Sequence, residues 1–365
     1  MSSLLLASPK EAIASYNKPL EVKTDEAWYN LGVVLINSGQ FEEAIASFDK
    51  VLEVEPDLYQ VWYNQGIALG ELGRHEEALA NWNKALKIKP DLHEAWYNRG
   101  IELLYLRRYK EALTSYDKAL KIKPDFYEAW NSRGIALRKL GSIEEAIASY
   151  DRALEVKPDF DEAWNNRGIA LGKLGSHYEA LTSYDNSLRI KPDKHQVWYN
   201  QGDALHNLGR YEEAIASYDT ALEIQPDYHE AWNNRGIVLD ELGRHEEAIT
   251  SFDKALEIKP DKHDAWGGRG NALHNLGRYE DAVASYDTAL EIKHDYYDAW
   301  YNRGIALGYL KRFEEAIVSF DKALEMQPDF HEAWYNRGIS LNNLGRLNEA
   351  ISSYDKALKI KPDKY

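Results

Sequence analysis

Asparagine recurs at multiples of 34 residues along most of this 365-residue chain. The eight members of the row are Asn30, Asn64, Asn98, Asn166, Asn200, Asn234, Asn302 and Asn336. A carboxamide both donates and accepts hydrogen bonds, so a row of carboxamides can bond the backbone of an extended peptide whatever its sequence. The row therefore predicts a peptide-binding surface. The alternative interpretation is that these amides serve only internal packing.

Neighbouring positions strengthen the peptide interpretation. The residue directly before each position of the asparagine row is most often tyrosine, a good contact residue at interfaces. Asp203 and Asn271 stand where the equivalent residues are apolar, and Gly267 and Gly268 are expected to widen the groove beside Asn271. The alternative for both polar positions is that the packing relaxed after a 68-residue pair of repeats was duplicated. The candidate peptide-binding residues that join the asparagine row are Tyr29, Tyr63, Tyr97, Asn131, Asn165, Tyr199, Asp203, Asn233, Asn271, Tyr301 and Tyr335.

Tryptophan spacing shows which elements must carry these side chains. Ten of the eleven tryptophans, from Trp28 to Trp334, are 34 residues apart without an insertion or deletion. Such a fixed period indicates a repeat protein, in which each repeat packs only on its neighbours. If each of these tryptophans is position 4, the ten repeats are 25–58, 59–92, 93–126, 127–160, 161–194, 195–228, 229–262, 263–296, 297–330 and 331–364.

Each repeat reads as two helices. Position 4 (Trp), position 8 (Gly) and position 11 (Leu) share one face of a first helix, and position 20 (Ala) and position 24 (aromatic) share one face of a second. Glycine at position 15 ends the first helix in eight repeats, with Arg107 and Lys311 as exceptions. Proline at position 32 ends the second helix in nine repeats, with His294 as the exception.

This pattern of Trp, Gly, Ala, aromatic and Pro closely resembles the tetratricopeptide repeat (TPR) family over residues 25–364. The resemblance implies an all-α fold, a right-handed superhelical α-solenoid of antiparallel helix pairs. It also implies that the first helices line the concave side and that the family's usual role, binding other proteins, resides there. Residues 8–23 imitate the second helix of a preceding repeat, and residues 1–24 are therefore predicted to form an N-terminal half-repeat helix.

One row departs from the family, which usually has leucine at position 7. Seven repeats have arginine there, namely Arg99, Arg133, Arg167, Arg235, Arg269, Arg303 and Arg337. Aspartate at position 25 is the expected partner, because a guanidinium on an inward stripe must meet a carboxylate or reach solvent. Repeat 2 would then match neutral Gln65 with neutral Asn83. The alternative is that the arginines reach into the ligand groove.

Charge narrows the choice of partner. Asp plus Glu total 60 against 44 for Lys plus Arg, and the net charge of −16 disfavours nucleic acid and anionic membranes. Positions 2, 5, 6 and 9 contain no lysine or arginine, whereas position 2 is acidic in eight repeats. The groove is therefore predicted to take a basic or neutral segment. It lacks the cations with which some family members hold acidic chain ends.

Other classes of function find little support. The chain has no cysteine, no P-loop, no metal-ligand spacing and no catalytic triad, so no enzyme, cofactor or metal site is predicted. No stretch has the length of a membrane span, and a cytoplasmic location is expected. The predicted function is a protein-interaction scaffold that binds a protein or peptide. The alternative is a homo-oligomer that stacks through uncapped solenoid ends.

Overall fold

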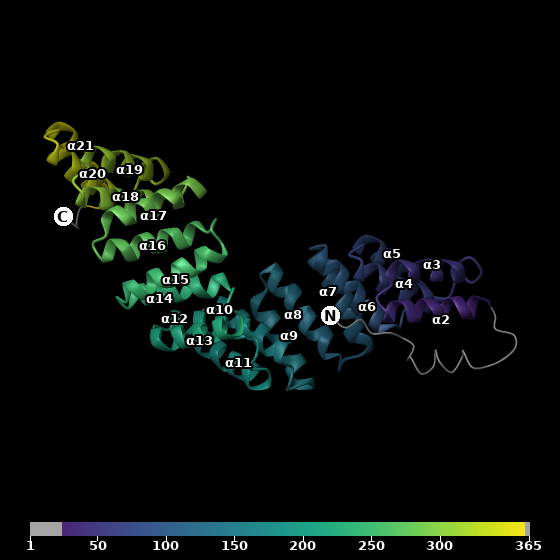
Figure 1. Ribbon diagram of the computed structural model, residues 1–365. Helices are drawn as coiled ribbons and strands as arrows, with labels where there is room; N and C mark the ends of the chain where they lie inside the picture. The colour runs from purple at the N-terminus through teal and green to yellow at the C-terminus, as the bar shows by residue number, and fades with distance from the viewer. Residues whose placement is uncertain (1–23, 362–365) are drawn as a thin grey trace. The chain divides into compact units, whose positions relative to one another are not determined.

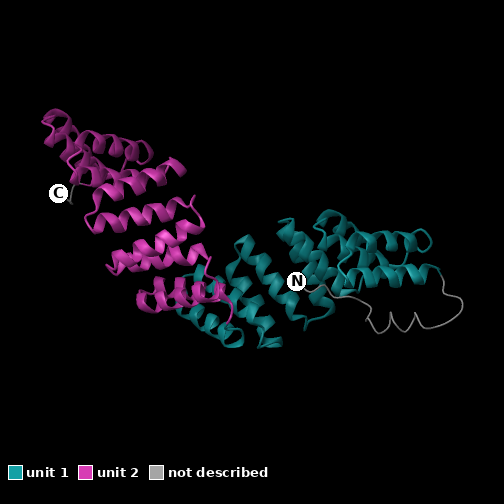
Figure 2. Ribbon diagram, in the orientation of Figure 1, with its two compact units in different colours: residues 1–192 teal, residues 193–365 magenta. Residues whose placement is uncertain are grey.

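The computed structural model describes residues 24–361 (Figure 1), so the half-repeat helix predicted for 1–24 lies outside the described residues except for Thr24. The chain divides into two compact units, Met1–Pro192 and Asp193–Tyr365 (Figure 2). The helices of unit 1 are α2 (Thr24–Asn37), α3 (Phe41–Leu52), α4 (Tyr59–Glu71), α5 (His75–Ile88), α6 (His93–Tyr105), α7 (Tyr109–Ile122), α8 (Tyr127–Leu140), α9 (Ile143–Val156), α10 (Asp161–Lys173) and α11 (His177–Ile190). The helices of unit 2 are α12 (His195–Asn207), α13 (Tyr211–Ile224), α14 (His229–Glu241), α15 (His245–Ile258), α16 (His263–Asn275), α17 (Tyr279–Ile292), α18 (Tyr297–Tyr309), α19 (Phe313–Met326), α20 (His331–Asn343) and α21 (Leu347–Ile360).

These helices form hairpins, and residues 24–361 contain no strand. Each even-numbered helix packs against the odd-numbered helix that follows it, and within a unit each hairpin packs on the next. The all-α solenoid of helix pairs predicted from the sequence is confirmed in each unit. First helices of successive repeats also contact each other, as α8 and α10 or α14 and α16 do. The surface that they share is the one that carries the candidate site.

Left-handed backbone at position 15 turns the chain between the two helices. Eight glycines have positive φ there, for example Gly141 at 89°. Arg107 and Lys311 adopt the same conformation, with φ of 57° and 59°. The turn geometry therefore persists in the two repeats that lack the glycine.

Glycine at position 8 lets the two helices of a hairpin approach each other. A Cβ on Gly134 would lie 2.5 Å from Cε1 of Tyr150, the aromatic residue at position 24. Ala146 at position 20 and the Tyr150 ring are both fully buried. The ring at position 24 fills the space that the glycine at position 8 leaves free, which gives the close packing expected of a protein core.

The register tryptophans link each repeat to the one before it. Nε1 of Trp62 donates to the carbonyl oxygen of Pro56 at 2.8 Å, and the same bond recurs at the end of other second helices. The exceptional repeat follows the rule, because Trp300 donates to the carbonyl of His294 at 3.0 Å. The hydrogen bond of the tryptophan therefore requires the backbone carbonyl at position 32 and not a proline ring.

Candidate functional site

The asparagine row forms hydrogen-bonded rungs between neighbouring first helices. Nδ2 of Asn64 donates to the hydroxyl of Tyr29 at 3.1 Å, a residue 35 positions earlier. Asn336 donates to Tyr301 in the same way at 3.0 Å. Where position 5 is asparagine the carboxamide accepts instead, as Oδ1 of Asn131 does from Asn166 at 3.0 Å. One donor of each of these amides is therefore used inside the protein.

Burial divides the predicted site residues. Five of them are buried: Tyr63, Asn64, Asn98, Asn131 and Asn233. In unit 1 the residues that keep exposed surface are Tyr29, Asn30, Tyr97, Asn165 and Asn166. In unit 2 they are Tyr199, Asn200, Asp203, Asn234, Asn271, Tyr301, Asn302, Tyr335 and Asn336. Each unit thus gathers part of the predicted set on its first-helix face.

The position-5 tyrosines also fill space between aromatic rings. The ring centroid of Tyr199 lies 5.9 Å from Tyr218 and 5.1 Å from Tyr228. Tyr301 lies between Phe320 and Phe330 at 6.0 and 4.6 Å. These tyrosines have a structural role whether or not a ligand contacts them.

Asp203 and Asn271 satisfy the hydroxyl of the position-24 tyrosine. Tyr218 Oη donates to Oδ1 of Asp203 at 2.7 Å, and Tyr286 Oη donates to Oδ1 of Asn271 at 2.8 Å. Each of these Oδ1 atoms also accepts a hydrogen bond from Nδ2 of the position-6 asparagine in the next repeat, at 3.0 Å in both cases. Burial raises the pKa of the Asp203 carboxyl, and the bonds from its neighbours oppose that rise. The polar residues at position 9 therefore join the packing network.

The expectation that Gly267 and Gly268 widen the groove is wrong. A Cβ on Gly267 would lie 3.0 Å from the hydroxyl of Tyr296, and one on Gly268 would lie 2.5 Å from Cζ of Phe252. Aromatic side chains of adjacent segments occupy the space that the missing side chains leave. A cavity of about 270 Å³ does exist nearby in unit 2, and its lining includes Asn271 and His274.

The arginine row is structural, as the pairing with aspartate predicted. Nε of Arg235 donates to Oδ1 of Asp219 in the preceding repeat at 2.6 Å, and Nη1 donates to Oγ of Ser251 in its own repeat. The same pattern holds at Arg133, Arg167, Arg269, Arg303 and Arg337.

The prediction that Gln65 pairs with Asn83 is wrong, because a position-7 residue pairs with position 25 of the preceding repeat and not with that of its own repeat. Gln65 Nε2 donates to Oδ1 of Asp49, and Arg99 of the following repeat donates to Asn83. A position-7 residue reaches back 16 residues, toward the second helix that precedes it.

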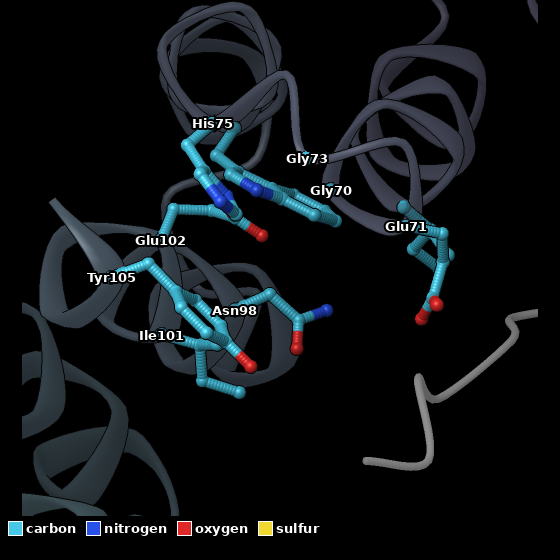
Figure 3. A pocket seen from close by; sticks show the side chains of 10 residues that line it. Gly70, Glu71, Gly73, His75, Asn98, Ile101, Glu102 and Tyr105 are labelled. Carbon is cyan, nitrogen blue, oxygen red and sulfur yellow. The ribbon is translucent and has the colours of Figure 1, made fainter. Parts of the chain in front are cut away.

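Unit 1 also contains a cavity of about 330 Å³ between α4, α5 and α6, which the sequence did not predict (Figure 3). Its wall contains Glu102, a buried carboxylate at position 10, where six other repeats have alanine. Oε2 of Glu102 lies 2.7 Å from Nδ1 of His75, whose ring stacks on Tyr105 at 4.9 Å. Burial raises the pKa of Glu102, and the His75 bond counters part of that effect. The charged residue at an alanine position was the signal that could have identified the cavity.

The described residues show neither a metal centre nor a membrane span. Between residues 24 and 361 no group of three or more His, Asp or Glu side chains is placed to hold a metal ion. No helix in the same range combines the length and apolar character needed to cross a bilayer.

Consecutive helix hairpins that each pack on the next define an α-solenoid repeat protein. Family models described as tetratricopeptide repeat or TPR repeat match residues 25–58, 297–330 and 331–364, residues 97–161, 133–195, 165–229 and 199–263, residues 68–105 and 270–310, and residues 251–284. The chain therefore belongs to the tetratricopeptide repeat family.

Solved structures with the same fold include a TPR protein from Parabacteroides merdae, which is 21% identical with a TM-score of 0.52 over 71% of this chain and 98% of its own. A chain of the APC/C hetero-tetramer Cut9-Hcn1 is 16% identical with a TM-score of 0.50 over 93% of this chain and 74% of its own. YrrB, described as a TPR protein with an unusual peptide-binding site, is 28% identical with a TM-score of 0.44 over 50% of this chain and 95% of its own. Curated protein sequences give no significant match.

Proposed function

We propose that this protein is an interaction scaffold whose first helices bind an extended basic or neutral peptide. The observation that supports the proposal is the character of the exposed first-helix face, which offers more hydrogen-bond acceptors than donors. Position 2 contributes carboxylates in eight repeats, and lysine and arginine are absent from positions 2, 5, 6 and 9. The rung of Asn166 uses one N–H of Nδ2, so its second N–H and its Oδ1 can face a ligand, whereas Oδ1 of Asn234 already accepts from Asn233. Peptide N–H groups and basic side chains complement such a surface.

The geometry of the rungs refines the role of the asparagines. Because Nδ2 of Asn166 donates to Asn131 at 3.0 Å, the amide is held in a fixed orientation before a ligand arrives. A fixed acceptor loses little conformational freedom on binding, which favours affinity. The rung at Asn166 leaves its Oδ1 available, so the rungs and the peptide interpretation are compatible.

The experiment is selection of binders from a displayed random peptide library, followed by fluorescence polarisation with the selected sequences. We expect enrichment of basic or uncharged peptides, with affinity that falls as salt rises. Joint replacement of Asn166, Asn200 and Asn234 by alanine should weaken binding at least tenfold. Asn64→Ala is the matched control, because Asn64 makes the same kind of rung but is fully buried. Enrichment of acidic peptides, or equal binding by the triple variant, would contradict the proposal.

A second candidate function, end-to-end self-association, is favoured by one observation. The last helix exposes Leu347, Ile351 and Leu358, with Leu358 at 41% whereas its counterpart Leu324 is at 6%. In other repeats the next hairpin covers this face, so a second copy or a further repeat would bury it. Sedimentation velocity at increasing concentration tests this candidate, with Ile351→Glu expected to abolish any association. A concentration-independent monomer would exclude it. The cytoplasmic location stays a prediction from composition.

A further inference from the structure

The cavity of unit 1 between α4, α5 and α6 has the make-up of a side-chain pocket, and residues of the first helices α4 and α6, among them Asn98, line it together with residues of α5 (Figure 3). We propose that it binds one arginine side chain of that peptide. This inference rests on the proposed function and names the residue that would fix the register of the peptide. The volume of about 330 Å³ lies at the lower end of the range of about 300–1,000 Å³ usual for small-ligand sites.

Glu102 supplies the central acceptor. Its side chain is buried, and the residue is only 6% exposed. Oε2 is held by His75, while Oε1 lies over Gly70, where the Cβ of an alanine would come within 2.6 Å. The absence of a side chain at Gly70 is therefore what gives the carboxylate its place. The His75 partner of Glu102 is a cation only when it is protonated; beside a neutral His75 the buried carboxylate is costly, and an arriving guanidinium would offset that cost.

Trp82 supplies a donor that lacks a partner. The indole lines the cavity and is 1% exposed. Its Nε1–H makes no hydrogen bond within the part of the chain that the structure describes, unlike Trp62 and Trp96, which donate to proline carbonyls. An unpaired buried donor is unfavourable, and a small displacement of the cavity wall on binding would let a peptide carbonyl satisfy it. The pocket thus offers both an acceptor and a donor to a single residue.

The remaining walls suit a guanidinium on an aliphatic stem. Ile67 and Ile101 are apolar, and Tyr105 presents a half-exposed ring. Figure 3 shows His75, Glu102 and Tyr105 gathered together, with the Glu71 carboxylate across from them. None of the lining residues is lysine or arginine. Arginine stacks on aromatic rings and donates to carboxylates through several N–H groups, so it fits this lining better than a neutral residue does.

The probe is Nα-acetyl-L-arginine methylamide, with the citrulline analogue as the uncharged isostere. Binding is followed through the Nε1–H signal of Trp82 in a ¹H–¹⁵N spectrum, assigned with Trp82→Phe. We expect a saturable shift with the arginine compound and at least tenfold weaker binding of the citrulline compound. Equal binding of the two, or no binding of either, would overturn the proposal.

Variants separate the pocket from general effects on folding. Glu102→Ala introduces the residue found at position 10 in six other repeats, so the hairpin should fold, and arginine binding should fall at least tenfold. Gly70→Ala should displace the carboxylate and weaken binding, whereas Gly172→Ala, at the same repeat position with open space around it, should not. Unchanged binding by Glu102→Ala would overturn the proposal. Circular dichroism melting checks the fold of each variant.

Failure of this pocket can be told apart from failure of the groove. The arginine compound is too small to occupy the first-helix face, so it reports only on the cavity. Selected peptides that bind without a preferred arginine, and with equal affinity to Glu102→Ala, would contradict the pocket and leave the groove standing. Saturable arginine binding in a protein that selects no peptide would contradict the groove instead.

Discussion

The guanidinium of Arg167 donates through Nε to Oδ1 of Asp151 at 2.7 Å, and so joins α10 to the second helix of the preceding repeat. Its Nη1 donates to Oγ of Ser183 at 2.8 Å in the second helix of its own repeat. The same side chain lies over the ring of Trp164, 5.9 Å from its centroid. One arginine thus connects three helices, and its recurrence in the other repeats makes position 7 a cross-link of the solenoid.

A double-mutant cycle on Arg167 and Asp151 should reveal this link. Both side chains keep solvent contact, 24% for Arg167 and 45% for Asp151, so the coupling energy should be modest, about 0.5–1 kcal/mol. Arg167→Ala alone should cost more, roughly 1–2 kcal/mol, because the bond to Ser183 and the packing on Trp164 are lost as well. Urea unfolding measures each value. The control pair Arg167 and Asp185 should show no coupling, and coupling there but not with Asp151 would disprove the assignment.

Two glycine-to-alanine changes in unit 1 should have opposite signs. At Gly134 the new Cβ would lie 2.5 Å from the Tyr150 ring, so Gly134→Ala should destabilise the protein by about 1–3 kcal/mol through overpacking. At Gly172 no atom of another group lies within 4 Å, so Gly172→Ala should stabilise by roughly 0.5–1 kcal/mol through helix propensity. Thermal and denaturant unfolding of both variants decide the matter. Equal effects would mean that position 8 is not a steric contact.

Glycine substitution should relieve the backbone strain at the two turns that lack a glycine at position 15. Arg107 and Lys311 have φ of 57° and 59°, a region that costs a residue with a Cβ roughly 1–2 kcal/mol. Arg107→Gly and Lys311→Gly should each stabilise the protein by about 0.5–1 kcal/mol, since the greater freedom of glycine in the unfolded chain cancels part of the gain. Gly141→Ala, at φ of 89°, is the reciprocal control and should destabilise by about 1 kcal/mol. A loss of stability in Arg107→Gly would indicate that its side chain makes a contact that outweighs the strain.

Much of this fold follows from the sequence because a strict 34-residue period repeats every packing contact. The helix pairs, the left-handed turn at position 15 and the partnership of arginine with aspartate are all visible as rows of one residue type. What the rows cannot specify is which copy of a row a side chain meets. Gln65 bonds to Asp49 and not to Asn83 because position 7 faces the preceding second helix, a relation that needs the stacking of repeats in three dimensions.

The candidate site was harder to predict, because its chemistry depends on single residues that differ from the residue usual at their repeat position. Asparagine and tyrosine of adjacent repeats bond to each other, so exposure, which sequence does not give, decides which of them can meet a ligand. Gly267 looked like an opening, yet Tyr296 from a later segment fills it. Glu102 interrupts a row of alanines, and only the structure shows that Gly70 and His75 make room for its carboxylate.

Asp203 and Asn271 provide a natural pair for testing the cost of a buried charge. Each accepts one hydrogen bond from the position-24 tyrosine and one from the asparagine of the next repeat through a single Oδ1 atom. Asp203→Asn should therefore keep the bonds from Tyr218 and Asn234 while it removes the charge, and it changes only the contact of the carboxylate with the Tyr199 hydroxyl. We expect a gain of about 1 kcal/mol in unfolding free energy at neutral pH, and a similar loss for Asn271→Asp.

The pH dependence of the Asp203→Asn effect has a defined sign. Burial holds the pKa of the Asp203 carboxyl above its ordinary value, so the folded protein binds the proton more tightly than the unfolded chain does. The penalty is therefore fully present above the raised folded pKa, shrinks as the pH falls through that pKa, and vanishes below the ordinary carboxyl range. The stability difference between Asp203→Asn and the wild type should narrow in step when urea unfolding is repeated from neutral to acidic pH. A gap that widens on acidification would mean that the hydrogen bonds from Tyr218, Asn234 and Tyr199 stabilise the ionised carboxylate more than burial penalises it.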